Sequence, residues 1–257
     1  GVIEPHCFAG FSGGREAVFP GVCSVDSISE IHCYRAIASP YATAGVLENN
    51  PVHIDMVHAA RKAGVAFICN VTLNADGKIT AAFAGELEEA HLKGCEFVRS
   101  LAQCTAVKGD IVVTSNGGYP LDQTLYQTAG GFATALGCAN EDAVIIMAAG
   151  CADGIGGEAF EEIILSGTPE SIDRKLAALS PTETIPGQWN AQIHVRALKK
   201  HRIIFVTSHL EHDLVRKANM VPALSLDEAM ATAFAMKGEE ARVVVIPDGA
   251  SVIPAGC

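Results

Sequence analysis

The chain has 257 residues, enough for one large domain or two modest ones. Hydrophobic residues make up 49% and charged residues 18%, an ordinary globular α/β composition that excludes a disordered or fibrous protein. The formal net charge of −11 would repel nucleic-acid phosphates and anionic lipid, and no run of basic residues offsets it. The longest apolar runs, such as AVIIMAAG (143–150), are far shorter than the about 20 residues of a membrane helix. We therefore expect no nucleic-acid and no membrane partner.

Residues 1–105 begin with a short apolar segment and a glycine-rich turn, which are followed by helices and a hairpin. PVHIDMVHAARKAG (51–64) has apolar residues at helical spacing and ends on a glycine. Two β-type runs follow, at 65–73 and 78–85, and the sequence NADG between them predicts a turn. GELEEAHLKGCEFVRSLAQ (85–103) is typical of an amphipathic helix. We expect this block to form one α/β lobe, the remaining part of an N-terminal domain.

Strands and helices alternate in the second block, residues 106–257. Short apolar runs predict strands at 110–116, 143–149, 202–208 and 241–247, and the segments between them predict helices at 121–136, 157–165, 169–179, 187–200 and 225–237. Such alternation indicates a parallel sheet with helices on both faces. The predicted fold class is therefore α/β with two α/β lobes, of which the C-terminal one is a doubly wound, mostly parallel sheet.

The loop SNGGYP (115–120) directly follows a predicted strand. Its two glycines would let backbone amides approach a carboxylate or a phosphate. The alternative is a strand–helix turn that needs positive φ, with Pro120 opening the helix. Because ligands bind parallel sheets beyond the carboxyl ends of the strands, we expect this loop, AGCADGIGG (149–157) and TSHLEHD (207–213) around one crevice. The sequence has neither a G-x-G-x-x-G fingerprint nor a Walker A loop, so it gives no support for NAD or ATP binding.

The stretch EPHCFAGFSGGREAVFPG (4–21) joins His6 and Cys7 to a glycine-rich turn, and a second histidine–cysteine pair follows at 32–33. Imidazole and thiolate are good ligands for zinc, nickel or copper, so these residues and Cys23 are candidates for a metal site. A phosphate cradle is a second possibility. The simpler interpretation is a histidine hydrogen-bonded beside a tight turn, with thiols that are small buried groups.

Two further patterns bear on metals and on compartment. His209 and His212 are spaced to share a helix face, but no H-E-x-x-H pattern accompanies them, and we expect a solvated helix start there. The nine cysteines are scattered without a C-x-x-C pair, which predicts reduced thiols and a cytoplasmic protein.

Five blocks of the sequence together resemble the nickel-dependent lactate racemase family. They are IEPHCFAGFSGGREAVFPGV, NPVHIDMVHAARKAGVAFICNVTLN, FAGELEEAHLKGCEFV, DIVVTSNGGYPLDQTLYQ and QWNAQ. The resemblance covers nearly the whole chain, which looks like the later three-fifths of a member. It implies a missing partner, the first portion of the family's N-terminal domain. Half of a domain should expose apolar surface where that segment belongs.

The resemblance implies an isomerase, a racemase or epimerase of a small 2-hydroxy acid. Family members hold nickel in a pincer made from a pyridinium-type mononucleotide, which takes the α-hydrogen as hydride and returns it to either face. Histidines exchange the hydroxyl proton. Carried over residue by residue, the implied roles are: catalytic acid–base, His6; nickel ligand, His32; cofactor contacts, Gly13, Gly14, Glu16 and Tyr126; substrate contacts, Gln127 and Trp189.

Both usual active-site lysines of the family are replaced. The family motif is S-G-G-x-K, whose lysine is joined covalently to the pincer, and here Glu16 stands at that position. The second lysine, which pairs with the substrate carboxylate, corresponds to Gly130, and its loss removes a contact worth about 1.5–3 kcal/mol. Arg15 is a candidate to replace one positive charge. For Glu16 the simpler interpretation is an acid in the first turn of a helix, stabilised by about 0.3–1 kcal/mol.

Three hypotheses follow from these residues. The first is a lactate-racemase-like 2-hydroxyacid racemase or epimerase that uses a nickel-pincer nucleotide. The second is a divergent homologue that lacks the covalent cofactor and binds a small organic anion without racemase activity. The third is a zinc hydrolase that uses His6, His32 and the nearby cysteines.

Overall fold

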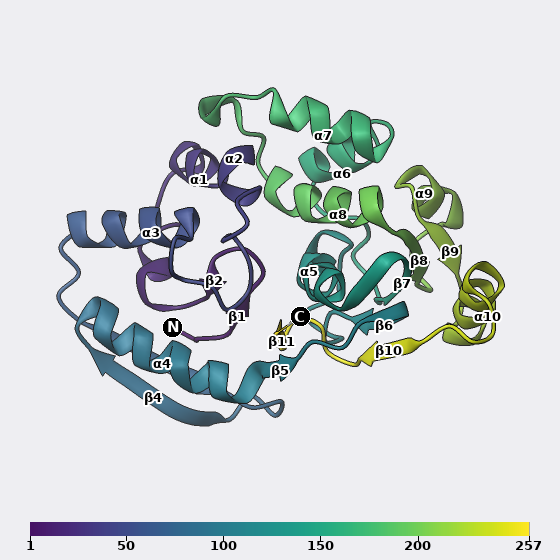
Figure 1. Cartoon of the computed structure of the whole chain (residues 1–257). Helices are drawn as coiled ribbons and strands as arrows, with labels where there is room; N and C mark the ends of the chain where they lie inside the picture. The colour runs from purple at the N-terminus through teal and green to yellow at the C-terminus, as the bar shows by residue number, and fades with distance from the viewer. Residues whose placement is uncertain (257) are drawn as a thin grey trace. The chain divides into compact units, whose positions relative to one another are not determined.

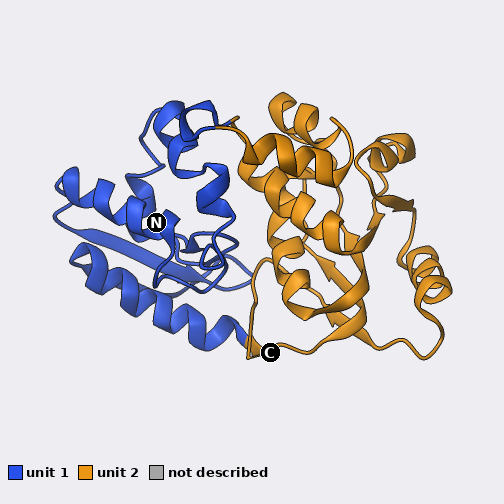
Figure 2. Ribbon diagram, turned by 45° about the horizontal axis from the view of Figure 1, so that its top comes forward, with its two compact units in different colours: residues 1–103, 180–184 blue, residues 104–179, 185–257 orange. Residues whose placement is uncertain are grey.

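The computed structural model describes residues 1–256, and the chain divides into two compact units (Figures 1 and 2). Unit 1 comprises residues 1–103 and 180–184, and unit 2 comprises residues 104–179 and the chain from 185 onward. Each unit has its own sheet and helices, so each is described by itself. No helix in residues 1–256 is long and apolar enough to cross a membrane.

Unit 1 is built on an antiparallel hairpin of β3 (Ile68–Leu73) and β4 (Ile79–Gly85). Alternate residues of β3 are buried, starting at Ile68, because successive side chains of a strand point to opposite faces. α4 (Leu87–Ala102) packs against both strands. The other elements of unit 1 are β1 (Pro5–His6), β2 (Gly10–Phe11), η1 (Gly14–Ala17), α1 (Val25–Ile31), α2 (Tyr34–Ile37), α3 (Pro51–Lys62) and η3 (Pro181–Glu183).

α3 shows why these residues form a helix where the sequence predicted one. The side chain of Asn50 accepts the N–H groups of Val52 and His53, and Pro51 occupies the first turn, where its missing N–H costs nothing. The apolar stripe that includes Val52 and Met56 is buried. The predicted hairpin and the amphipathic helix after it are likewise confirmed, with boundaries shifted by a few residues.

Unit 2 contains a parallel five-stranded sheet in the order β10-β6-β7-β8-β9. The chain winds from β6 outward to β9 and then returns to the far side of β6, so the topological switch lies between β6 and β10. The strands are β6 (Gly109–Ser115), β7 (Ala139–Ala148), β8 (Arg202–Val206), β9 (Val221–Ala223) and β10 (Val243–Ile246). A separate pair joins β5 (Gln103–Thr105) to β11 (Ile253–Ala255).

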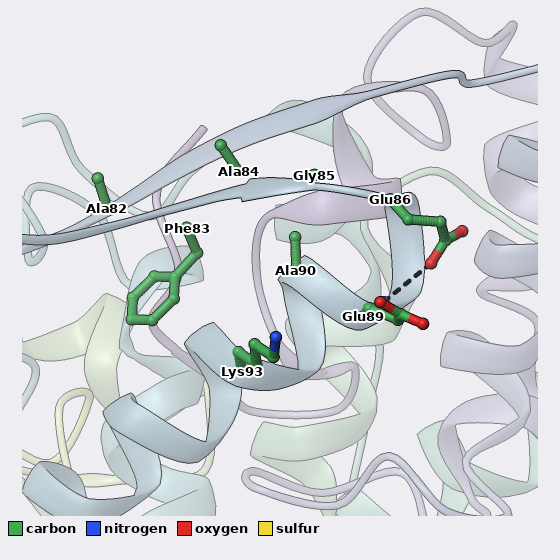
Figure 3. Close-up of a pocket in the computed structure, with 8 residues that line it drawn as sticks. All are labelled: Ala82, Phe83, Ala84, Gly85, Glu86, Glu89, Ala90 and Lys93. Carbon is green, nitrogen blue, oxygen red and sulfur yellow. Dashed lines mark hydrogen bonds between the residues drawn. The ribbon is translucent and has the colours of Figure 1, made fainter.

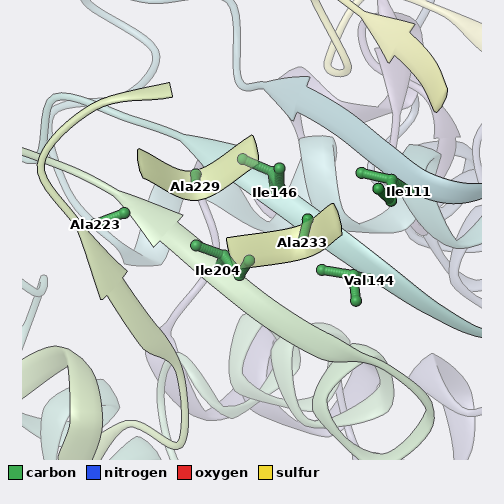
Figure 4. Close-up of a cluster of buried hydrophobic side chains, with 7 residues drawn as sticks. All are labelled: Ile111, Val144, Ile146, Ile204, Ala223, Ala229 and Ala233. Carbon is green, nitrogen blue, oxygen red and sulfur yellow. The ribbon is translucent and has the colours of Figure 1, made fainter. Parts of the chain in front are cut away.

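Helices cover both faces of this sheet, as a doubly wound fold requires. On one face α10 (Leu226–Lys237) packs Ala229 and Ala233 onto Ile146 and Ile204 (Figure 4). On the other face α5 (Ala129–Cys138) lies so close that a Cβ at Gly131 would come 2.8 Å from the Met147 side chain. The remaining helices are η2 (Tyr126–Thr128), α6 (Glu158–Ile164), α7 (Pro169–Ala177), α8 (Gln188–Lys200) and α9 (His212–Lys217).

The predicted α/β fold class is confirmed, including the parallel sheet. One predicted element is wrong at its start: the helix expected over 121–136 begins only at Tyr126 as a 3-10 turn and continues as α5. Pro120 therefore does not open it. Residues 121–125 are instead held by backbone bonds to the loop after β7, such as Cys151 N–H to the Asp122 carbonyl at 2.8 Å. The helices α1 and α2 and the short strands β1, β2, β5, β9 and β11 carried too little periodicity to be predicted, whereas α9 begins at His212, where a helix start was expected.

The loops at the carboxyl ends of the strands meet, as expected from the sequence. The Asp122 carboxylate accepts the Gly150 N–H at 2.7 Å, and the Thr207 hydroxyl donates to the Gly150 carbonyl at 3.0 Å. Gly117 and Gly118 have φ of 84° and 74°, so the prediction of a turn with positive φ in SNGGYP is confirmed.

The buried face of the sheet should dominate the stability of unit 2. Replacing Ile146, which is fully buried, by alanine should lower the free energy of unfolding by about 2–5 kcal/mol through lost burial and a cavity. Val245→Ala, in β10 and 63% exposed, is the control and should cost about 0.5 kcal/mol or less. Urea denaturation checks both, and equal losses in the two variants would contradict the packing described.

Candidate active site

The glycine turn of unit 1 needs glycine at two consecutive positions. Gly13 and Gly14 have φ of 78° and 56°, a region that side chains disfavour. A Cβ on Gly14 would come within 2.7 Å of the His91 ring, and one on Gly13 would come within 2.8 Å of the Val2 carbonyl. The turn therefore packs closely against the His91 ring and the Val2 carbonyl, and it leaves no space at these two positions for a phosphate.

Arg15 lies beneath this turn with 1% of its surface exposed. Its guanidinium donates to the carbonyls of Phe11 at 2.6 Å, Gly13 at 3.1 Å and Ala9 at 2.8 Å, and Nη1 lies 3.1 Å from Nε2 of His91. Burial lowers the pKa of Arg15, although Glu16 nearby raises it again. The sequence-based idea that Arg15 supplies a positive charge to a ligand finds no support here, because Nη1 and Nη2 donate to the chain's own carbonyls, while Nε is buried without a hydrogen-bond partner among the described residues.

Glu16 caps the same turn. Its Oε2 accepts the Gly13 N–H at 2.7 Å, and Glu16 stands in the first turn of η1. The Gly14 N–H is accepted by Asn70 Oδ1 at 3.2 Å. The simpler interpretation of Glu16, an acid favoured at a helix start, is thus confirmed, and both glycine amides bind the protein itself in this structure.

His6 is half-buried beside Glu16, with its Nε2 4.0 Å from Glu16 Oε1. The Ala9 N–H donates to Nδ1 at 3.2 Å, which places the proton of the neutral ring on Nε2. Burial, and after it the charge of Arg15, lowers the pKa of His6 to about 4. His6 is therefore neutral at pH 7.

His32 follows α1 and is 5% exposed. Its Nδ1 lies 2.8 Å from the Ile28 carbonyl, and because a carbonyl can only accept, Nδ1 carries the proton and the lone pair lies on Nε2. Burial lowers the pKa of His32 to about 4. Phe8 meets His32 edge-on at 5.3 Å and His6 at 4.5 Å between ring centroids, so the two histidines flank one aromatic ring. A neutral imidazole with Nδ1 bonded to a carbonyl is the usual form of a metal-binding histidine.

The zinc-hydrolase interpretation is wrong for residues 1–256, which contain no group of three His, Cys, Asp or Glu side chains placed to hold a metal. Cys23 donates to the Val18 carbonyl at 3.2 Å, and Cys33 is buried. His209 and His212 do not share a helix face either: α9 begins at His212, and His209 lies before it against the Gly150 carbonyl.

Tyr126 and Trp189, two of the candidate residues in unit 2, contact each other. The Trp189 Nε1–H donates to the Tyr126 hydroxyl oxygen at 2.9 Å, and Asn190 donates to the Tyr126 carbonyl at 3.0 Å. Phe160 meets the Tyr126 ring edge-on at 5.2 Å. In this structure Trp189 therefore fixes the orientation of the Tyr126 phenol.

Gln127 and Gly130 lie on η2 and at the start of α5. Gln127 Oε1 accepts the N–H and hydroxyl of Thr124 at 2.9 and 3.1 Å, and its amide nitrogen donates to the Pro120 carbonyl at 3.3 Å. Its amide thus holds the loop that follows β6. A Cβ at Gly130 would lie 3.2 Å from Asn116 Oδ1 and 3.5 Å from Ala250 Cβ, so a longer side chain fits with a small adjustment.

Sequence reasoning missed the residues that position the glycine turn. Asn70 and His91 are 3% and 2% exposed, and both contact the turn directly. Asn50 donates from Nδ2 to the Phe8 carbonyl at 2.9 Å and so holds the chain between His6 and the turn. In the sequence, each of these three residues is only a polar residue within an otherwise apolar segment. Polar residues also occur in such segments at the starts of strands and helices, so the pattern did not mark them.

Comparisons with known proteins agree with the fold and with the order of the motifs. The family model described as "Lactate racemase C-terminal domain" matches residues 104–254, and the model "Lactate racemase N-terminal domain" matches residues 1–45. A lactate racemase of Thermoanaerobacterium thermosaccharolyticum is 48% identical over 254 residues, and one of Lactiplantibacillus plantarum is 46% identical over 255 residues. Each alignment covers 98% of this chain but 60% of the relative, so the chain spans about three-fifths of their length.

Solved structures extend the comparison. The lactate racemase apoprotein from Thermoanaerobacterium thermosaccharolyticum matches with a TM-score of 0.97 and 47% identity, over 99% of this chain and 61% of that one. A Thermotoga maritima protein matches with a TM-score of 0.66 and 17% identity, over 96% and 64% of the two chains. The second likeness concerns the fold alone.

The contact of Glu16 with Gly13 predicts how position 16 tolerates substitution. Glu16→Gln keeps an oxygen that accepts the Gly13 N–H and should change the free energy of unfolding by about 0.5 kcal/mol or less. Glu16→Lys cannot accept it and should cost about 0.5–2 kcal/mol, the usual cost of a lost cap. Urea denaturation of the two variants compares them, and a lysine variant as stable as the glutamine variant would contradict this contact.

The buried histidines predict that unit 1 loses stability in acid. The pKa of His91 is lowered from 6.5 to about 4, chiefly by burial and then by Arg15. The unfolded chain therefore binds this proton first, so the free energy of unfolding is greatest above pH 6.5 and falls as the pH drops to about 4. His91→Gln should flatten that fall by up to about 1.4 kcal/mol per pH unit. Urea denaturation between pH 7 and pH 4 measures the slope, and an unchanged slope in the variant would contradict the assignment.

Proposed function

The chain belongs to the lactate racemase family, and from that premise we propose that it is the larger part of a 2-hydroxyacid racemase or epimerase. Its substrate would be a small 2-hydroxy acid such as the lactate named for its relatives, and its cofactor a nickel-pincer nucleotide. The N-terminal part that the relatives carry beyond these 257 residues would be a required partner. We place the enzyme in the cytoplasm because of its scattered cysteines.

The observation that carries the proposal is the state of His32. Its Nδ1–H bond to Ile28 leaves the lone pair on Nε2, and its lowered pKa keeps the ring neutral, as a metal ligand must be. A pincer cofactor supplies most of the donors to its own metal, so a single protein ligand suffices. The residues present therefore fit nickel held by His32 and a cofactor, although they do not form a metal site by themselves.

The pincer nucleotide, when bound, would supply the acceptor and donor of the α-hydrogen as hydride. His6 would move the hydroxyl proton of the substrate. In this structure the lone pair of its ring is on Nδ1 and accepts the Ala9 N–H at 3.2 Å. A proton can be accepted only at a lone pair, so catalysis by His6 requires that this contact open when substrate arrives.

Position 16 does not fit the covalent tether of the family. A carboxylate cannot form the link that the lysine amine forms, and Glu16 is already bound to the Gly13 N–H. We therefore propose that Gly13, Gly14 and Glu16 border a cofactor that is held without a covalent bond. Glu16 would sit unfavourably beside a nucleotide phosphate, which predicts weaker retention of the cofactor than in a lysine-containing member.

In unit 2, Tyr126 would contact the cofactor, and Gln127 and Trp189 would contact the substrate. The hydrogen bond from Trp189 supports a role in orienting the phenol of Tyr126 rather than a separate contact. Gln127 would have to exchange its Thr124 contacts for substrate. Gly130 leaves the carboxylate of the substrate without the lysine partner of the family.

A second candidate function has its own support. Glu16 on Gly13 and the absence of a lysine at 130 favour a homologue that binds a small organic anion without racemase activity. The two candidates differ in one result, because only the first interconverts enantiomers.

Racemisation of lactate tests the proposal directly. The chain should be co-expressed with the N-terminal part of the Thermoanaerobacterium relative in cells that make the pincer cofactor, and both enantiomers followed by chiral chromatography. We expect activity that falls at least about 100-fold in His32→Ala and in His6→Asn, in line with loss of a ligand or a general acid–base. His58→Ala, an exposed position on α3, is the matched control and should leave activity unchanged.

The same assay separates the two candidates. No racemisation of lactate or of other 2-hydroxy acids, with nickel and cofactor present, would leave only the anion-binding homologue.

Restoring a cation at position 130 should strengthen substrate binding. In Gly130→Lys the ammonium would reach the carboxylate of the substrate and lower KM by about 10- to 150-fold, the equivalent of about 1.5–3 kcal/mol. Ala133→Lys adds the same charge one turn further along α5 and serves as the control. Steady-state kinetics measure KM for both variants. An equal change in KM would contradict a direct contact between Lys at position 130 and the substrate carboxylate, because it would mean that the added charge acts only at long range.

A further inference from the structure

A buried histidine of unit 2, His194, contacts the turn η2, which carries Tyr126 and Gln127. It belongs to α8, which packs against both η2 and α5 (Figure 1). His194 is 1% exposed, and the rings of Phe132 and Phe160 meet it edge-on at 4.9 and 5.4 Å between ring centroids. The reaction proposed above does not use this residue.

Both ring nitrogens of His194 have partners. Nδ1 lies 2.8 Å from the Asn190 carbonyl, and Nε2 lies 3.0 Å from both the Leu125 carbonyl and the Thr128 hydroxyl. Burial lowers the pKa of His194 to about 4, although the two carbonyls raise it, so at pH 7 the ring is neutral and carries one proton. Because a carbonyl oxygen can only accept, that proton serves one carbonyl and not both.

The shorter contact with a carbonyl indicates where the proton lies. A proton on Nδ1 donates to Asn190 at 2.8 Å and leaves the lone pair on Nε2, where it can accept the Thr128 hydroxyl. That hydroxyl also lies 2.7 Å from the Leu125 carbonyl. When it turns to Nε2, this carbonyl still accepts the Thr128 N–H at 3.1 Å, so both buried groups keep a partner.

Two further side chains of α8 hold the same turn. The Trp189 Nε1–H donates to the Tyr126 hydroxyl oxygen at 2.9 Å, and Asn190 Nδ2 donates to the Tyr126 carbonyl at 3.0 Å. η2 is only three residues long and has no side-chain cap among the described residues. Because so short a turn is not stable by itself, its position depends on these contacts with α8.

A polar side chain often serves only its own helix. Glu86, beside a pocket of about 240 Å³ at the start of α4, accepts the N–H groups of Glu88 and Glu89 at 2.9 and 3.0 Å (Figure 3). His194 differs, because its Nε2 contacts a residue 66 positions earlier in the chain. Its hydrogen bonds therefore fix one element against another.

We propose that His194 is a positioning residue of the candidate active site, which acts through Thr128 on the turn that carries the proposed cofactor and substrate contacts. The inference rests on the proposed function for the roles of Tyr126 and Gln127, whereas the hydrogen bonds of His194 are independent of it. The competing explanation is a histidine that fills the core of unit 2 and contributes only to stability.

The tautomer of His194 tests the proposal in the unmodified chain. Nitrogen NMR of labelled histidine, with the signal assigned by its loss in His194→Gln, should show a neutral ring at pH 7 that is protonated on Nδ1. A proton on Nε2 would overturn the proposal, because Nε2 could then not accept the Thr128 hydroxyl.

Fluorescence of Trp189, the one tryptophan of the 257-residue chain, reports on η2. His194→Leu removes both side-chain hydrogen bonds, and Thr128→Val removes the hydroxyl alone. In each variant acrylamide should quench Trp189 at least about twofold faster, because the turn opens more often. His194→Gln can again accept the Thr128 hydroxyl and should restore slow quenching. Thr128→Val decides if His194→Leu does not fold.

Val195→Ala is the control for lost stability. Val195 is fully buried and follows His194 on α8, so it lies on another face of the helix. This variant should lower the melting temperature but leave the quenching of Trp189 unchanged. Equal quenching in Val195→Ala and His194→Leu, or a glutamine variant that behaves like the leucine variant, would overturn the proposal.

Kinetics connect the contact to the reaction. If the chain racemises lactate, His194→Leu and Thr128→Val should each lower kcat about tenfold or more through misplaced site residues. The double variant should be no worse than either single one, because both break the same contact. Unchanged kcat in the single variants would overturn the proposal. If the original chain does not racemise lactate, the proposed function fails, and the tautomer and the quenching still decide the role of His194 at η2.

Discussion

The buried guanidinium of Arg15 determines the shape of the candidate site in unit 1. It binds the carbonyls of Ala9, Phe11 and Gly13, the last of which also accepts the Glu16 N–H at 3.1 Å. With those carbonyls directed inward, the Gly13 and Gly14 amides face Glu16 and Asn70. The same backbone holds the Ala9 N–H against His6. A buried cation thus acts here through the main chain and not by meeting a ligand.

Glu16 gives the site a chemistry that differs from the family's while leaving its architecture intact. A lysine there would offer an amine to the cofactor, whereas the carboxylate closes the turn by capping Gly13. His32 is unaffected by this exchange, because its position depends on α1 and on the Ile28 carbonyl. The covalent tether and the nickel ligand are therefore separable in our proposal, which keeps the second at His32 without the first at position 16.

Much of the fold could be predicted from the sequence, because long amphipathic and apolar segments such as α3 and β7 carry a clear period. The start of α5 could not, since the segment before Tyr126 is fixed by contacts with the loop after β7, which are remote in sequence. At the candidate site, residue chemistry marked His6 and His32 only as possible metal ligands, and their separate roles came from the family resemblance. The burial of Arg15 had no local signal, because its partners are main-chain carbonyls that every sequence has.

The central claim is that this chain holds nickel through His32 and a pincer cofactor that is not covalently bound. The most direct measurement is elemental analysis combined with intact-protein mass spectrometry, on the chain purified together with the N-terminal part from cells that make the cofactor. The account predicts near-stoichiometric nickel, a protein mass without an adduct, and loss of the nickel after denaturation. Zinc in place of nickel, no metal at all, or a covalent adduct on the chain would contradict it.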